Sequence, residues 1–251
     1  MMRTLVLQSQ REPLPHAWLE PCLASVRHWA ALKNFEYRFI GDELFEPLDS
    51  TFLAKVSGQI VIATDLARLL WLRDCLNQGF ERVIWLDADV LVFHPQALEP
   101  LDAACAVGRE VWIQATDRGR LKAFRKVHNA FLMFRRDSAF LDFYIETAQR
   151  LVMHNNAGMP PQFIGPKLLT ALHNVVQLPV QEDVGMLSPL LIEELLNEPG
   201  DALALLQRKS SHRLCAANLC SSSVSDGRLS DAQMTHLIGL LLQHDPFKPG
   251  S

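Results

Sequence analysis

The sequence contains no apolar run that approaches the ~20 residues needed to cross a lipid bilayer. Its longest late run, Leu237–Leu242, fits one face of a helix. Residues 1–15 also lack the long apolar core and the small-residue cleavage site of a secretory signal peptide. We therefore expect a cytoplasmic protein without a transmembrane segment, either free or peripheral to a membrane.

Paired cysteines and excess positive charge are absent as well. The five cysteines are an odd number without a Cys-x-x-Cys pair, which favours a reducing compartment over a disulfide framework. A net charge of −4 gives the chain as a whole no nucleic-acid signature. Repeats, low-complexity tracts and linkers are missing from the 251 residues, so we expect one domain over 1–251.

Strand and helix patterns alternate through the first hundred residues. Runs of branched apolar residues predict strands at Arg3–Ser9, Phe35–Gly41 and Arg82–Leu86. Helical spacing predicts helices at His16–Lys33 and Gln59–Gln78. This order predicts an α/β fold with a mostly parallel central sheet flanked by helices.

The pattern becomes mixed and less regular beyond residue 100. Strands are predicted at 110–116, 129–135 and 175–179, and amphipathic helices at 138–154 and 230–243.

Two aspartates follow the third predicted strand directly. Asp87 and Asp89 come after the unbroken apolar run Val83–Leu86, and two unpaired ionised carboxylates are costly to bury. At the carboxyl end of a central parallel strand, they would lie where open α/β sheets bind ligands. Mg²⁺ or Mn²⁺ combines one or two protein carboxylates with substrate phosphates and would neutralise the pair. A solvated turn is the alternative interpretation.

A second charged pair lies on the preceding helix. Asp65 and Arg68 are three residues apart, so they share a face of a helix that is apolar on most sides. An exposed ion pair of this kind contributes only ~0.2–1 kcal/mol to stability. The pattern therefore indicates either a functional pair or a simple intrahelical ion pair.

The segment from Ile62 to Val92, "IATDLARLLWLRDCLNQGFERVIWLDADVLV", resembles the DxD region of nucleotide-sugar-dependent glycosyltransferases of the GT-A fold. It is most similar to retaining families related to α-1,6-mannosyltransferases, "sugar-binding region containing DxD" proteins and clostridial toxin glucosyltransferases. The resemblance implies a metal-dependent, retaining glycosyltransferase with a UDP- or GDP-linked sugar donor. Its acceptor would be a carbohydrate, a lipid-linked glycan or a protein.

The resemblance also implies roles for residues of a nucleotide-binding half, 1–100. Asp87 and Asp89 would hold Mn²⁺ or Mg²⁺ and act in catalysis together with Arg68. Arg68 and Asp87 would also contact the nucleotide diphosphate, and Asp65 the ribose or base. The end of the first strand would contact the base through Gln8 and Ser9.

Residues 101–251 would form the acceptor and sugar half. "HNAFLMFRR" and "QFIGPKLLTAL" resemble family elements that place Asn129 and Gly165 near the donor sugar or the acceptor. Asn129 is equally explained as a polar residue that opens a strand, and Pro166 as the start of a helix. Near the end, "HRLCAANLCSSSV" lies where the family places a final metal or diphosphate ligand. Its candidates are Asn218, His212 and Ser222, although a surface role also suits His212.

The charge run of the basic segment 117–126 is typical of a solvated helix face, or of a loop that closes on the donor or the acceptor.

Two other functions stay open. A haloacid-dehalogenase-like phosphohydrolase also uses a strand followed by D-x-D, but it needs Thr or Val where this chain has Leu91. A catalytically silent GT-A scaffold would bind a nucleotide without turnover.

Overall fold

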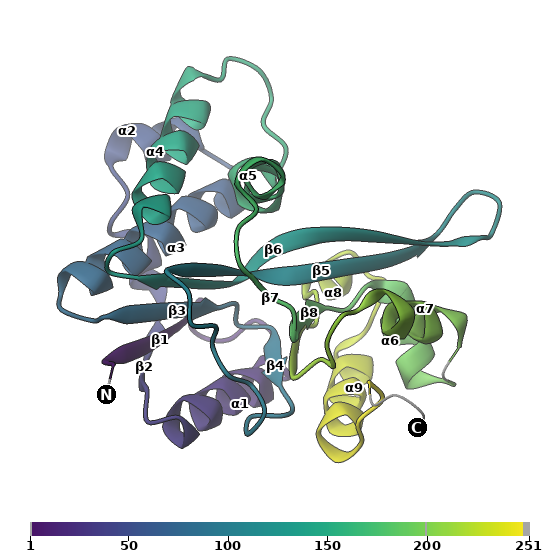
Figure 1. The fold of residues 1–251 in the computed structure, drawn as a ribbon. Helices are drawn as coiled ribbons and strands as arrows, with labels where there is room; N and C mark the ends of the chain where they lie inside the picture. Colours follow the sequence, from purple (N-terminus) through teal and green to yellow (C-terminus); the bar gives the residue numbers. More distant parts are fainter. Residues whose placement is uncertain (1, 199, 248–251) are drawn as a thin grey trace.

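A computed structural model describes residues 2–198 and 200–247 (Figure 1). A six-stranded sheet in the order β2-β1-β3-β6-β5-β7 lies at its centre. The strands are β1 (Thr4–Ser9), β2 (Glu36–Ile40), β3 (Arg82–Leu86), β5 (Cys105–Ala115), β6 (Leu121–Arg135) and β7 (Val180–Gln181). β1 is parallel to β2 and β3, and β5 is parallel to β7, whereas β6 is antiparallel to β3 and β5. The sheet is therefore mainly parallel, as predicted.

Helices cover both faces of this sheet, with α3, α4 and α5 on one face and α1 on the other (Figure 1). The helices of this part are α1 (Leu19–Leu32), α2 (Ser50–Lys55), α3 (Ile60–Asn77), α4 (Ala139–His154) and α5 (Leu168–Val176). Short helical turns lie at η1 (Asp42–Phe45) and η2 (Phe163–Lys167).

The two covered faces explain the unbroken apolar sequence of β3. Val83 and Trp85 point into the cluster formed with α3 and α4, whereas Ile84 and Leu86 point into the cluster formed with α1. All four are at most 1% exposed, so each position of the strand lies in a core. Such double burial is typical of strands inside α/β sheets.

A second sheet, which the sequence did not predict, brings the C-terminal part to the end of β3. It has the order β4-β9-β8 and consists of β4 (Val90–Val92), β8 (Val184–Met186) and β9 (Ala216–Asn218). β9 pairs antiparallel with β4 and parallel with β8. The C-terminal helices are α6 (Pro189–Leu196), α7 (Asp201–Lys209), α8 (Ser222–Ser225) and α9 (Asp231–Gln243).

Strands β5 and β6 continue beyond the sheet as a long hairpin arm that lies over α6 and α7 (Figure 1). The arm corrects the interpretation of 117–126 as a helix face or closing loop, because Leu121–Lys126 pairs with Glu110–Ala115 throughout. Residues 117–120 form the turn, where Gly119 has a φ of +70°.

The predicted helices, and the strands predicted in residues 1–100, agree with the structure to within a few residues, whereas β5 and β6 begin well before the predicted 110–116 and 129–135. The predicted strand at 175–179 is wrong, because Val175 and Val176 end α5 and the strand begins only at Val180. The apolar residues there close the amphipathic helix before Gln177 adopts a left-handed conformation. All five cysteines are buried and free. Within the described residues, no helix combines the length and apolarity needed to cross a bilayer.

Candidate functional site

Asp87 follows β3 directly and is held through one of its two carboxylate oxygens. Its Oδ1 accepts hydrogen bonds from Trp85 Nε1, at 2.7 Å, and from an Arg68 guanidinium nitrogen, at 2.9 Å. The side chain is 26% exposed. Its Oδ2 receives no hydrogen bond from the described residues, so one carboxylate oxygen stays available for a ligand.

Asp89 lies two residues further on and is held by the last residue of β9 and by the segment that follows it. Its Oδ1 accepts from Asn218 Nδ2 at 2.6 Å, and its Oδ2 accepts from the backbone N–H of Ser221 at 2.8 Å. Asn218 is itself fixed, because its Oδ1 accepts from the Cys220 N–H at 2.8 Å. Burial, and next the charge of Asp87, raise the pKa of Asp89 above its ordinary value.

Arg68 connects the aspartate region to a buried polar network behind it. The same guanidinium nitrogen that binds Asp87 also donates to the backbone carbonyl of Asn129, at 3.0 Å. A second guanidinium nitrogen lies 3.4 Å from Asp65 Oδ1, which also accepts from Asn129 Nδ2 at 2.8 Å. Arg68 is only 6% exposed, so it is a buried cation between two carboxylates.

The carboxyl group of Asp65 is the most enclosed member of this network. It is 4% exposed, and its Oδ2 has no hydrogen-bond partner among the described residues. Burial raises the pKa of Asp65 to about 6, although Arg68 and Asn129 both act to lower it. The Asp65–Arg68 pair is therefore a buried ion pair in contact with the Asp87 carboxylate, and not an exposed pair on a helix surface.

A cavity of about 490 Å³, here called the Asp87 cavity, opens in front of these groups. Its volume lies within the range of small-molecule binding sites. Arg68, Asp87 and Asp89 form a charged part of its wall, and another part of the wall is apolar. The apolar part consists of Leu44, Phe45, Ile60 and Val61. Ile60 and Val61 are 61% and 44% exposed, which is unusual for large aliphatic side chains and favours a ligand surface.

The end of β1 contributes one predicted residue to the cavity and one beneath it. Ser9 lines the Asp87 cavity, and its Oγ is buried without a hydrogen-bond partner in the described structure. Gln8 is fully buried. Its Nε2 donates to the Asp87 carbonyl at 3.2 Å, and its Oε1 accepts from the Tyr37 hydroxyl at 3.2 Å. This placement corrects the role predicted for Gln8, which supports the Asp87 backbone instead of facing a nucleotide.

Asp65, Asn129 and Gly165 lie together behind the cavity and do not line it. A Cβ atom at Gly165 would stand 2.3 Å from Asp65 Oδ2 and 2.9 Å from Asn129 Nδ2. Only glycine allows this close approach. The structure thus brings the three predicted residues into one contact group, but burial opposes direct nucleotide contact by Asp65.

The C-terminal candidates separate in the structure. Asn218 hydrogen-bonds to Asp89, whereas His212 lines a different pocket. There, His212 Nδ1 lies 3.2 Å from Ser211 Oγ. This position corrects the prediction of His212 as a metal ligand. Ser222 is exposed, and it is the preceding Ser221 that lines the Asp87 cavity.

Several residues of the site escaped prediction. Ser221 acts through its backbone N–H, which no side-chain pattern reveals. Trp85 precedes the aspartates in sequence, and a buried indole N–H beside a carboxylate is a signal that could have been used. Thr64 and the η1 turn reach the cavity through the tertiary fold alone.

The residues present fit a hard divalent cation held jointly with phosphate oxygens. In residues 2–198 and 200–247, no three His, Cys, Asp or Glu side chains come together as a metal-binding group. Asp87 and Asp89 nevertheless offer two carboxylates, and Asp87 keeps one oxygen without a partner in the described structure. The raised pKa of Asp89 reflects, after burial, like-charge repulsion by Asp87, which a cation would relieve.

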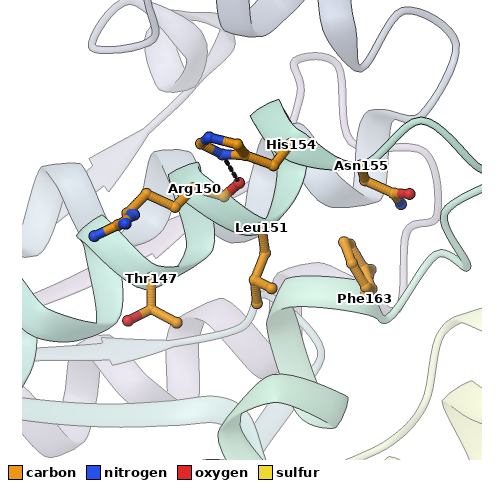
Figure 2. A pocket seen from close by; sticks show the side chains of 6 residues that line it. All are labelled: Thr147, Arg150, Leu151, His154, Asn155 and Phe163. Carbon is orange, nitrogen blue, oxygen red and sulfur yellow. Dashed lines mark hydrogen bonds between the residues drawn. The ribbon is translucent and has the colours of Figure 1, made fainter.

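Another cavity, of about 590 Å³, lies against the outer side of α4, where Figure 2 shows Phe163 facing Leu151 and Asn155. Its lining contains no carboxylate and no residue predicted for the site. We therefore place the candidate site at the Asp87 cavity.

No protein-family model and no protein of curated function matches the sequence. The structure is similar to that of a glycosyltransferase involved in the glycosylation of the major capsid of PBCV-1, with 10% identity and a TM-score of 0.54. The similarity covers 95% of this chain and 99% of that chain.

Two further solved structures match over most of their length. The galactosyltransferase LgtC, in complex with donor and acceptor sugar analogues, covers 94% of this chain and 95% of its own, at 11% identity and a TM-score of 0.48. Mouse xyloside xylosyltransferase 1 covers 88% and 98%, at 11% identity and a TM-score of 0.45. The likeness to the first structure, taken with the mainly parallel sheet, shows that this chain has the GT-A glycosyltransferase fold.

Proposed function

We propose that the protein is a metal-dependent glycosyltransferase that uses a nucleotide-diphosphate sugar as its donor. One observation carries the proposal: on a GT-A fold, Asp87 and Asp89 lie together in the wall of a cavity of about 490 Å³ that also has an apolar side. The apolar side suits a base and ribose, and the carboxylates suit a cation that binds the diphosphate.

The chain's own residues supply the positions for this chemistry. Asp87 and Asp89 would hold Mn²⁺ or Mg²⁺, and the cation would supply positive charge for the leaving diphosphate. Arg68 adds a fixed cation next to Asp87, and Asn218 and Ser221 keep Asp89 in place. Arg11 also lines the Asp87 cavity.

In the transfer, an acceptor hydroxyl oxygen bonds to the anomeric carbon while the bond from that carbon to the diphosphate oxygen breaks. The electron pair of the broken bond leaves on the diphosphate, which also takes the hydroxyl proton. Retention at the anomeric carbon and a UDP- or GDP-linked donor are what the resemblance of residues 62–92 implies, and both belong to the proposal.

The phosphohydrolase alternative is not favoured. Asp87 follows β3, the third strand along the chain, in a GT-A fold, and Leu91 stands where the phosphatases need Thr or Val. A silent scaffold differs from an enzyme in turnover alone, so it is an outcome of the experiment below.

The experiment measures slow hydrolysis of a nucleotide sugar when no acceptor is present. We expect Mn²⁺-stimulated release of free sugar from a UDP- or GDP-linked donor. Asp87→Asn is the sharpest variant, because Asn retains Oδ1 for Trp85 and Arg68 and removes only the charge and the second oxygen. Its rate should fall by ~100-fold or more, the loss expected for an electrostatic stabiliser of a leaving group.

Asp74→Asn is the matched control, because Asp74 lies near the far end of α3 and its side chain is 42% exposed. This variant should release sugar at the wild-type rate. Undiminished release from Asp87→Asn would contradict the proposed site. Donor binding without any release of sugar would identify the silent scaffold, and phosphate release from a generic aryl phosphate would identify a phosphatase.

A further inference from the structure

A third cavity, of about 560 Å³, lies against the hairpin arm and is here called the hairpin cavity. Two aromatic side chains from the arm line it, together with a carboxylate and an ammonium group from the same strands. These residues are Glu110, Trp112, Phe124 and Lys126. Nothing in the site described above uses this group of side chains.

The alternation of β5 explains why these side chains share one face. Glu110 and Trp112 point to the hairpin cavity, whereas Val111 and Ile113 point the other way and are 4% and 1% exposed. The two buried residues belong to the apolar cluster that includes the C-terminal helices α6, α7 and α9. One face of the arm is thereby fixed to the protein body, and the other is free to bind.

The pairing of the two strands places the two aromatic residues opposite each other on one face. Trp112 is the direct cross-strand partner of Phe124, and Glu110 is the partner of Lys126. Directly opposed residues have Cβ atoms about 5 Å apart. Trp112 and Phe124 are each partly exposed, so the pair offers an aromatic surface within the cavity, with a charge of each sign next to it.

The second sheet links the hairpin cavity to the carboxylates of the proposed donor site. Met186 lines the hairpin cavity and pairs with Asn218, the residue that holds Asp89. The pairing of β8 with β9 therefore connects one wall of the hairpin cavity to the residue that holds Asp89.

The lining has the chemistry that a sugar ring requires. The C–H face of a pyranose packs against aromatic rings, and its hydroxyls need acceptors and donors at the edge. Glu110 supplies an acceptor and is only 9% exposed, and Lys126 and Gln162 supply donors. A nucleobase could also stack here, but the Asp87 cavity already has the apolar surface next to the cation-binding carboxylates.

We propose that the hairpin cavity binds the saccharide acceptor, whose ring packs on Trp112 and Phe124 while a hydroxyl donates a hydrogen bond to Glu110. This assignment rests on the proposed glycosyltransferase function, because a bound saccharide is an acceptor only if the protein transfers a sugar. It narrows the acceptor to a molecule that presents a sugar ring, and so disfavours direct transfer to a protein side chain.

The test is saturation-transfer NMR on the full chain with Mg²⁺. The probes are the methyl α- and β-glycosides of glucose, galactose and mannose, with maltose and lactose as disaccharides. In wild-type protein we expect transfer to the ring C–H protons of at least one probe. Trp112→Ala and Phe124→Ala should each weaken that binding by about tenfold, the scale of a lost aromatic contact.

Two further variants make the result specific. Trp112→Phe should recover most of the binding, because it restores an aromatic ring. Phe143→Ala removes an aromatic side chain that is 50% exposed on α4, outside the hairpin cavity, and should bind like wild type. Thermal melting of each variant checks that the fold is intact. Wild-type protein that binds no probe, or binding unchanged in both alanine variants, would overturn the proposal.

The two proposals fail in different ways. Absence of metal-dependent binding of UDP or GDP to wild-type protein would remove the glycosyltransferase function, while saccharide contact at Trp112 would still stand as a sugar-binding site. Nucleotide binding without saccharide contact at the arm would retain the donor site and remove the acceptor assignment.

Discussion

Acid should destabilise the protein at one buried imidazole that joins its two sheets. His128, on β6, is fully buried. Its Nε2 donates to the carbonyl of Val184 on β8 at 3.1 Å, and its Nδ1 accepts the Ala130 N–H at 3.2 Å. A proton on Nδ1 would face that N–H donor and lose the bond. Protonation therefore costs the Nδ1 bond to Ala130 and buries a charge at the junction of the six-stranded and three-stranded sheets, although the Nε2 bond to Val184 is kept.

The size of the effect follows from the pKa of His128. Burial, as the largest cause, lowers it from 6.5 to about 4. Between these values the unfolded chain binds a proton that the folded chain does not, so stability is fully present above pH 6.5 and falls as the pH falls. At about 1.4 kcal/mol per pH unit, this interval corresponds to about 3 kcal/mol of unfolding free energy.

Urea unfolding at a series of pH values between 4 and 7 measures this loss. His128→Gln removes the titrating group, so the stability difference between wild type and variant should change by about 3 kcal/mol across the range. His154→Gln, at an exposed histidine on α4, should follow the wild-type curve. Parallel curves for wild type and His128→Gln would refute the reasoning, as would an NMR titration of His128 with a midpoint near 6.5.

Two further predictions concern the network behind the Asp87 cavity. Gly165→Ala should lose about 1–3 kcal/mol of unfolding free energy in urea, because the added methyl group would overlap Asp65; Gly158→Ala, with open space around it, should be nearly neutral. Arg68→Ala should lose about 3–5 kcal/mol, since it leaves the buried carboxylate of Asp65 without its cation. A nearly neutral Arg68→Ala would show that the ion pair is not structural.

The sequence was sufficient for those parts of the fold that local patterns determine. The helix from Ile60 to Asn77 and the strand Arg82–Leu86 show their periodicity and their ends within a few residues. The capping box of Ser230 and Gln233 likewise fixes the start of the last helix. The aspartates follow from the same reasoning, because charge directly after a doubly buried strand demands a partner.

The rest depends on distant pairing that one sequence does not display. Strands β4, β8 and β9 have three residues each, so no alternation could identify them. They bring Ser221 to Asp89, and that contact determines which C-terminal residue reaches the site. His212 was predicted from its position in a motif, but the turn before β9 carries it into a different pocket.

Gln8 and Asp65 were predicted as ligand contacts, and burial explains why they contact other protein groups instead. A polar residue at a strand end or on an apolar helix can face a ligand or another buried polar group. In this chain Gln8 satisfies the Asp87 carbonyl, and Asp65 satisfies Asn129. The sequence indicates that such residues need partners, and only the fold decides which partners they have.

Isothermal titration of UDP and GDP, with Mn²⁺ and again in chelator, measures whether Asp87 and Asp89 form a metal-dependent nucleotide site. We expect one nucleotide to bind only with the metal. Asp87→Asn, which preserves both hydrogen bonds to Oδ1, should lose this metal-dependent binding. Asp74→Asn should bind like wild type. Equal affinity of wild-type protein with Mn²⁺ and in chelator would contradict the assignment of Asp87 and Asp89 as a metal-dependent nucleotide site.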